Sequence, residues 1–74
     1  SPCFNSRPVI KGDKLYLVSF NDVLFVVNIK EGKLIRKLQL SPDGCCVSTP
    51  VIAGKNIYIA DMMGRLYAIP LANF

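Results

Sequence analysis

The sequence predicts an all-β chain, because one strand-rich pattern occurs twice at a fixed spacing. Residues 6–12, SRPVIKG, return as residues 48–54, STPVIAG, after a shift of 42 positions. The same shift pairs Tyr16 with Tyr58 and Leu24 with Leu66. A repeat in the low forties with strand-like content is typical of stacked β-propeller blades. We therefore expect a segment of about two blades, with seven strands in antiparallel meanders.

The first repeat, residues 6–40, predicts four strands. Apolar and β-branched residues with turn residues between them mark strands at residues 8–10, 15–18, 23–29 and 34–40. Pro8 is acceptable as the first residue of a strand. Turns are expected at Gly12, at Asn21-Asp22 and at Gly32, which are residue types that favour tight turns.

The second repeat, residues 48–71, is incomplete and predicts three strands. These lie at residues 50–52, 56–60 and 65–71, after a longer connection around Pro42. The connections within each repeat are short, and short connections join antiparallel strands. No second copy of residues 33–40 follows. We therefore expect residues 1–74 to be a segment of a larger propeller, and we expect this segment to begin within a loop.

Apolar patterning predicts where each strand lies in its sheet. Residues 15–18 and 23–27 are apolar on both faces, as expected of strands covered above and below. The segment 34–40 alternates instead, and we expect Leu34, Leu38 and Leu40 to share one face of an outermost strand.

Two blades alone are expected to expose a dry face at each end of their stack. The residues predicted on these faces are Leu15, Leu17, Phe25, Val27, Ile57, Ile59, Tyr67 and Ile69. A chain of 74 residues buries only about 60% of its unfolded surface and is marginal alone. We therefore expect the remaining blades of a parent protein, or other copies of this chain, as partners, and a further protein partner is possible.

Composition argues against two other classes of partner. The formal net charge is +4, but no aromatic residue stands among the basic residues at positions 30–37. Surfaces that bind single-stranded nucleic acid normally combine basic and aromatic side chains. Lysines on an outer strand also discourage edge pairing, so nucleic acid is disfavoured as a partner. No apolar run approaches the roughly 18 residues of a membrane span.

The repeated motif resembles the quinoprotein-type, or PQQ-like, β-propeller repeat. It reads S-x-P-V-[IV]-x-G-x-x-[IVL]-Y-[IVL], then L-[YF]-[AV]-[IVL], and in the first repeat it closes with E-G-K-L-I. The match covers most of residues 6–40 and 48–71. Two positions depart from the family pattern: Arg36 stands where a docking tryptophan is common, and Asn21-Asp22 aligns with Met63-Gly64.

The resemblance implies three alternative roles. Some proteins with this repeat are dehydrogenases that hold pyrroloquinoline quinone and calcium, some are catalytically silent scaffolds of the bacterial outer membrane, and some are accessory propellers of multidomain enzymes. The family also favours a bacterial periplasmic or envelope location. A fold hosts many functions, so the repeat alone does not decide among them.

Adjacent cysteines are the main candidates for cofactor binding. Cys45-Cys46 precedes a blade, and quinoprotein alcohol dehydrogenases carry adjacent cysteines joined in a disulfide beside their cofactor. The simpler interpretation is two small thiols in an inter-blade connection, with Cys3 in the matching position one repeat earlier. Three cysteines and no histidine form no disulfide framework or zinc set. We expect no metal site in this segment.

Other polar residues are expected to be structural. Every carboxylate falls in a predicted turn or at a strand end, where it would cap a turn; a calcium-binding or catalytic pair is the alternative. These residues are Asp13, Asp22, Glu31, Asp43 and Asp61. Arg36 and Arg65 are expected in exposed or inter-blade ion pairs. Without histidine, imidazole-based catalysis cannot arise here, so we predict no catalytic residue in this segment and a non-catalytic scaffold or binding role.

Overall fold

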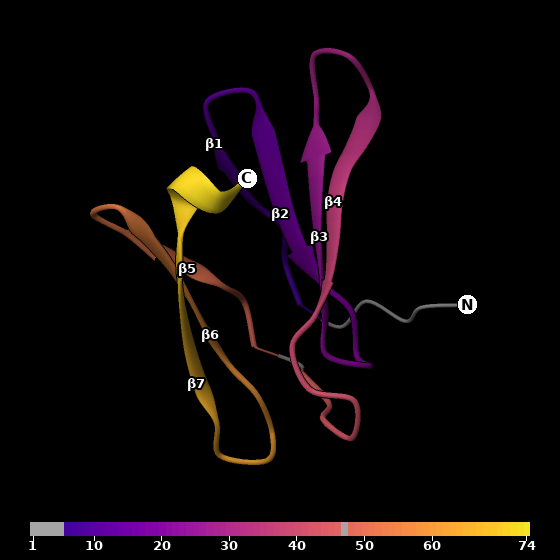
Figure 1. Cartoon of the computed structure of the whole chain (residues 1–74), viewed down its shortest axis with the longest axis vertical. Coiled ribbons are helices and arrows are strands. Elements are labelled where there is room, and N and C mark those ends of the chain that lie inside the picture. Colours follow the sequence, from indigo (N-terminus) through magenta and orange to yellow (C-terminus); the bar gives the residue numbers. More distant parts are fainter. Residues whose placement is uncertain (1–5, 47) are drawn as a thin grey trace.

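The computed structural model describes residues 6–46 and 48–74, and over these residues the all-β prediction is confirmed. A four-stranded antiparallel sheet, the first sheet, has the order β1-β2-β3-β4, and a three-stranded antiparallel sheet, the second sheet, has the order β5-β6-β7 (Figure 1). The strands are β1 (Val9–Lys11), β2 (Lys14–Val18), β3 (Val23–Asn28), β4 (Lys33–Gln39), β5 (Val51–Ala53), β6 (Asn56–Ala60) and β7 (Leu66–Pro70). A single 3-10 turn, η1 (Leu71–Asn73), follows β7. This arrangement fits a segment of two propeller blades.

Among the described residues, no helix is long and apolar enough to cross a membrane.

Two hairpin turns repeat each other bond for bond. In the β2–β3 turn the Ser19 N–H donates to Val23 O at 2.9 Å, and the Asp22 N–H donates to Ser19 O at 3.0 Å. In the β6–β7 turn the corresponding bonds, 42 positions later, are 3.0 and 3.3 Å long. Both turns end in a left-handed residue, Asp22 with φ 65° and Gly64 with φ 82°. A type I turn closed by a left-handed residue is a common three-residue hairpin connection, and glycine is the residue it favours.

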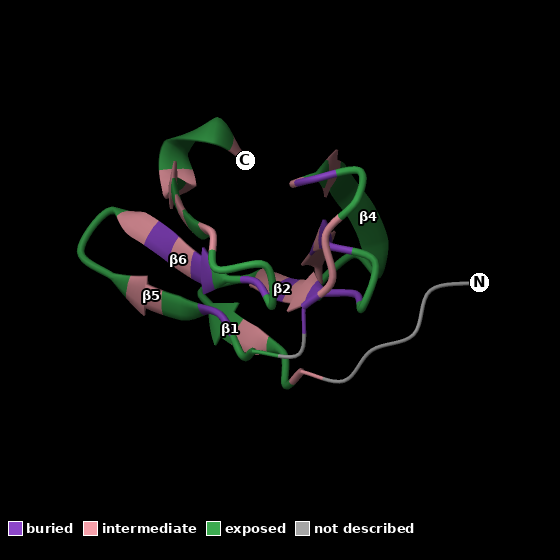
Figure 2. Ribbon diagram, turned by 90° about the horizontal axis from the view of Figure 1, so that it is seen from below, coloured by how far each residue is buried: buried purple, intermediate pink, exposed green. Residues whose placement is uncertain are grey.

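The core lies between the two sheets. Tyr16, Val18, Leu24 and Val26 from β2 and β3 form one buried cluster with Ile57 and Ile59 of β6, and Cys46 belongs to the same cluster. Figure 2 shows buried stretches of β2 and β6 in purple. Side chains alternate between the faces of a strand, so Leu15 and Leu17 of β2 point to the opposite face of the first sheet. Each sheet therefore buries one apolar face against the other sheet.

The two sheets use different faces in their shared core. Leu24 is fully buried, whereas Leu66, which occupies the same position in the second repeat, is 71% exposed. Conversely, Ile57 and Ile59 are buried, while the matching Leu15 and Leu17 are only half-buried. The sheets are therefore stacked in the same sense, so that each presents a different end of the stack to solvent.

This stacking corrects half of the expected open-face set. Ile57 and Ile59 are buried in the core, and Tyr67 and Ile69 pack against it. The face of the second sheet that is turned away from the core carries Leu66 instead. The sequence pattern could identify two apolar faces per blade, but it could not say which face of each blade meets its neighbour.

A β-bulge in β4 corrects the predicted pattern of the outer strand. The pairing of β3 with β4 shifts between Val26, which lies opposite Arg36, and Val27, which lies opposite Leu34. β4 has one extra residue at this point, so the side chains before the bulge lie on the opposite face from the one that strict alternation predicts. Leu38 packs against the core as expected, but Leu34 does not share its face and is 55% exposed.

The C-terminal turn covers one end of the space between the sheets (Figure 1). The Phe74 ring meets the Tyr16 ring edge-on, with centroids 6.0 Å apart. The Arg36 guanidinium lies over the Phe74 ring at 5.8 Å and donates to Asn73 O at 3.2 Å. Arg36 thus joins the outer strand of the first sheet to the end of the second. It forms no ion pair with any described residue, so the expected ion pair of Arg36 is replaced by a cation–π contact and a hydrogen bond.

The stacking direction predicts unequal costs for the same substitution at matched positions. Leu24→Ala should lower the free energy of unfolding by about 2–5 kcal/mol, because it leaves a cavity in the core. Leu66→Ala, the matched control, should change it by less than about 0.5 kcal/mol, as is usual for surface positions. Urea denaturation of the 74-residue chain at low protein concentration measures both. Equal costs would contradict the assignment of faces.

Candidate functional site

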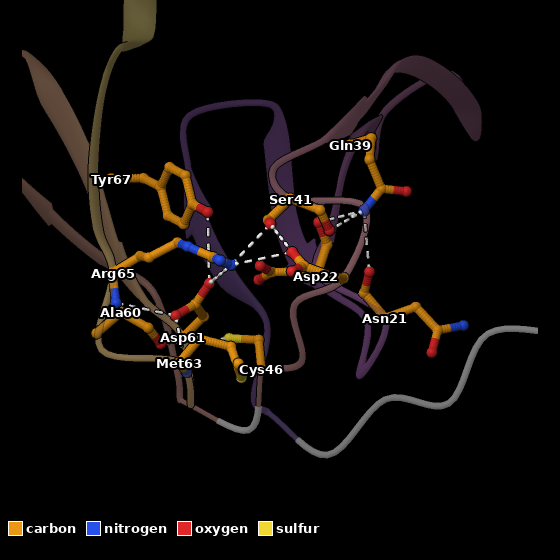
Figure 3. Close-up of polar contacts among 11 residues, drawn as sticks. Asn21, Asp22, Gln39, Ser41, Cys46, Ala60, Asp61, Met63, Arg65 and Tyr67 are labelled. Carbon is orange, nitrogen blue, oxygen red and sulfur yellow. Dashed lines mark hydrogen bonds and ion pairs between the residues drawn. The ribbon is translucent and has the colours of Figure 1, made fainter.

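The two repeated turns meet at the segment that connects β4 to β5, at the lower end of Figure 1. The Cys46 N–H donates to Phe20 O of the β2–β3 turn at 2.9 Å, and the Met62 N–H of the β6–β7 turn donates to Cys45 O at 2.8 Å. The connection is therefore hydrogen-bonded to both turns. We call residues 19–22, 41–46 and 61–65 the turn junction, and Figure 3 shows polar side-chain contacts within it.

Asp61 closes its own turn from inside the junction. Its Oδ1 accepts hydrogen bonds from the Met63 and Arg65 N–H groups, each at 3.0 Å. Its Oδ2 lies 3.4 Å from the Tyr67 hydroxyl and 3.7 Å from Arg65 Nη1. Burial alone would raise the pKa of Asp61, but hydrogen bonds from the Arg65 N–H, Asp22 and the Met63 N–H leave it below its ordinary value. Asp61 thus caps a turn as predicted, although its side chain is buried.

Asp22 is the unusual residue of the junction. Its side chain is fully buried, and neither carboxyl oxygen has a hydrogen-bond donor that meets geometric criteria among the described residues. It also occupies the left-handed position that Gly64 fills in the second repeat. Few non-glycine residues adopt this conformation, although aspartate is among those that tolerate it. The expectation that Asp22 caps a turn was wrong, because its carboxyl group points into the junction instead of back to its own backbone.

The Asp22 and Asp61 carboxyl groups both lie beside Gly44. Burial, followed by the hydrogen bond to Asp61 and the Asp61 charge, raises the pKa of Asp22 from 3.8 to about 6. Neighbouring carboxyl groups do not readily ionise together, so below about pH 6 one of them retains a proton. We assign this proton to Asp22, which then donates it to the Asp61 carboxylate. The protonated form supplies the partner that an ionised Asp22 lacks.

A glycine makes room for this pair. A Cβ atom added at Gly44 would lie 2.1 Å from Asp22 Oδ2 and 3.1 Å from Asp61 Oδ2. The φ angle of Gly44 lies outside the left-handed region, so the glycine is required here by space and not by backbone conformation. The connecting segment can pass this close to both carboxyl groups only without a side chain.

Arg65 links the second sheet to the connecting segment, as the expected inter-blade ion pair. Its Nη1 donates to Ser41 Oγ at 2.7 Å and lies 3.3 Å from Asp43 Oδ1. Ser41 Oγ in turn donates to the same Asp43 oxygen at 2.7 Å. The hydrogen bond from Ser41, followed by the Arg65 charge, lowers the pKa of Asp43. The ion pair is well exposed, and exposed pairs add little stability.

Gln39 supports the junction from the end of β4. Its Nε2 donates to Ser41 O at 2.7 Å and to Asn21 O at 3.0 Å, and it lies 3.3 Å from Asp22 O. These bonds hold the backbone of the β2–β3 turn against the start of the connecting segment. The alternating pattern of segment 34–40 gave no sign of this role.

The adjacent cysteines lie in the junction as free thiols. Cys46 is buried, and its Sγ lies 3.6 Å from Ser48 O and 3.5 Å from Ala60 O. Burial raises the pKa of the Cys46 thiol, which lowers its reactivity. Cys45 is partly exposed. The disulfide that the family resemblance implies is not formed, and Cys3 lies outside the described residues.

The described residues contain no group of three or more His, Cys, Asp or Glu side chains placed to hold a metal ion. No enclosed pocket opens in that part of the chain. Asp13 and Glu31 lie in exposed turns away from the junction. The chemistry that the arrangement supports is the sharing of a proton between two buried carboxyl groups.

Comparison with known proteins adds no relative. No family model matches the sequence, and no curated protein matches it. The resemblance to the quinoprotein-type repeat therefore stays a prediction from the motif.

The clearance at Gly44 predicts a rescue. Gly44→Ala should destabilise the chain by more than Gly54→Ala, which meets open space and costs only about 1–2 kcal/mol of left-handed backbone strain. Asp22→Gly removes the atom in the way, so Gly44→Ala should cost less in that background. Thermal unfolding of the two single variants, the double variant and the Gly54→Ala control measures this. Additive effects of Gly44→Ala and Asp22→Gly would contradict the contact.

Proposed function

We propose that the chain supplies two neighbouring blades of a β-propeller and acts as a non-catalytic scaffold or binding module. The observation that carries this proposal is the match between the buried face of one sheet and the open face of the other. The core face of the first sheet holds Tyr16, Val18, Leu24 and Val26, and the same positions of the second sheet are Tyr58, Ala60, Leu66 and Ala68. The open face of the second sheet therefore resembles the core face of the first sheet. A further sheet could pack on it as the second sheet packs on the first.

The opposite end of the stack is complementary. Ile10, Leu15 and Leu17 occupy the positions of Ile52, Ile57 and Ile59, which pack into the present core. Ile10 is 60% exposed, and Leu15 and Leu17 are half-buried. One end of the chain thus resembles the surface that the other end would bind.

Such an interface is head-to-tail, and repeating it gives a ring if the rotation closes. The added blades can come from the same polypeptide or from other copies, and three copies would give six blades and four would give eight. Burial of apolar surface contributes roughly 25 cal/mol per Å², so covering a few hundred Å² at each end adds several kcal/mol. That is a large fraction of the stability of a small domain.

The dehydrogenase alternative assigns pyrroloquinoline quinone and calcium to the parent protein, with Cys45 and Cys46 beside the cofactor. The accessory-propeller alternative places an active site elsewhere in a multidomain enzyme. No contact among the described residues specifically favours either, and both stay predictions. A bacterial periplasmic or envelope location likewise rests on the resemblance alone.

A mixing experiment tests the head-to-tail interface. Ile10→Lys and Leu66→Lys each place a charge on one open face. Both native side chains are largely exposed, so a lysine at either position should not prevent folding. Each variant alone should stay monomeric in sedimentation, because every contact needs both faces. An equimolar mixture should form a one-to-one pair through the two intact faces.

Met63→Lys serves as the control, since Met63 is 55% exposed in a turn and lies on neither face. This variant should associate like the original chain. If the original chain does not associate in sedimentation at micromolar concentration, the proposal is contradicted. Failure of the mixed variants to pair would contradict the head-to-tail geometry.

A further inference from the structure

We propose that Asp22 and Asp61 form a proton-operated latch between the two sheets: the turn junction is tight when the pair holds one proton and loosens when both carboxyl groups are ionised. This inference does not depend on the proposed function. It rests on the geometry of the junction, where a buried carboxyl group from one sheet faces a carboxyl group from the other.

The Asp22 carboxyl group has no other hydrogen-bond partner among the described residues. Both of its carboxyl oxygens are buried without a geometrically suitable donor. Asp61 Oδ1 already accepts two backbone hydrogen bonds, and its Oδ2 is shared with Tyr67 and Arg65. Gly44 lies against both groups and leaves no space for a side chain beside them. A proton held between the pair is the contact that this geometry accommodates.

The charged and titratable neighbours come from each element packed against Asp22. The β6–β7 turn supplies Asp61 and Arg65, and the connecting segment supplies Asp43 and Cys46. Tyr67 of β7 contacts Asp61. Arg65 is the one cation that acts on Asp22 among the described residues, and it also contacts Asp43. If both members of the pair are ionised, three carboxylates face one guanidinium. One proton on Asp22 reduces this excess of negative charge.

The direction of the pH effect follows from linkage. The folded pKa of Asp22 is raised to about 6, so its stabilising effect is complete below its ordinary value of 3.8 and is lost as pH rises through about 6. The pKa values of Asp43 and Asp61 are lowered, so their effects are lost only as pH falls below the ordinary range of aspartate. Between about pH 4.5 and pH 7.5 the change should therefore come mainly from Asp22.

Hydrogen exchange at the two backbone bonds of the junction tests the latch directly. After correction for intrinsic rates, protection of the Cys46 and Met62 amides should fall about tenfold from pH 4.5 to pH 7.5. The Ile29 amide, bonded to Asp13 O at the far turn, should change much less. Asp22→Asn keeps the size and can donate a hydrogen bond to Asp61 without ionising, so its junction amides should lose the pH dependence.

Two further measurements keep the test decisive. Carbon-13 NMR of the aspartate carboxyl groups should show one group with a midpoint near pH 6, and Asp22→Asn should abolish it. Asp22→Gly restores the residue type of the second repeat and should also remove the pH dependence, even if the asparagine variant folds poorly. The latch would be overturned by the absence of any aspartate titrating above about pH 5. It would also be overturned by pH-dependent protection that persists in both Asp22 variants.

Discussion

The apolar contact between the two sheets is the interaction on which the rest of the structure depends. Neither a four-stranded nor a three-stranded meander covers both of its own faces, and each buries one against the other. Leu24 and Val26 of the first sheet meet Ile57 and Ile59 of the second within one cluster. Because the sheets repeat the same pattern and stack in the same sense, this contact leaves unlike, complementary faces open. A structure of this kind continues naturally by adding further sheets.

The turn junction combines this packing with an electrostatic cost. The second repeat ends its turn with Gly64, which adopts the left-handed conformation without strain, and Asp61 accepts the backbone hydrogen bonds of that turn. The first repeat uses Ser19 Oγ at the capping position and Asp22 at the glycine position. A carboxyl group in a buried, left-handed position is unfavourable on conformational and solvation grounds. Such a residue is acceptable if a proton is retained, and that links the seam between the sheets to pH.

The sequence supports most of the fold and little of the site. The 42-residue repeat and the turn residues place all seven strands, with ends that differ from the observed ones by at most one residue. The stacking direction and the bulge opposite Val26 and Val27 depend on three-dimensional packing and have no local signature. At the site, one signal was present: Asp22 aligns with Gly64, so a charged residue stands at a glycine position. That Asp22 meets Asp61 follows only from the path of the connecting segment past Gly44.

The first sheet packs through Leu24 and Val26 onto Ile57 and Ile59 of the second sheet. Methyl–methyl nuclear Overhauser effects in the 74-residue chain test this packing most directly. We predict cross-peaks that join the methyl groups of Val18, Leu24 or Val26 to those of Ile57 or Ile59. If Ile57 and Ile59 show no cross-peaks to these residues while Leu66 does, the stacking described is contradicted.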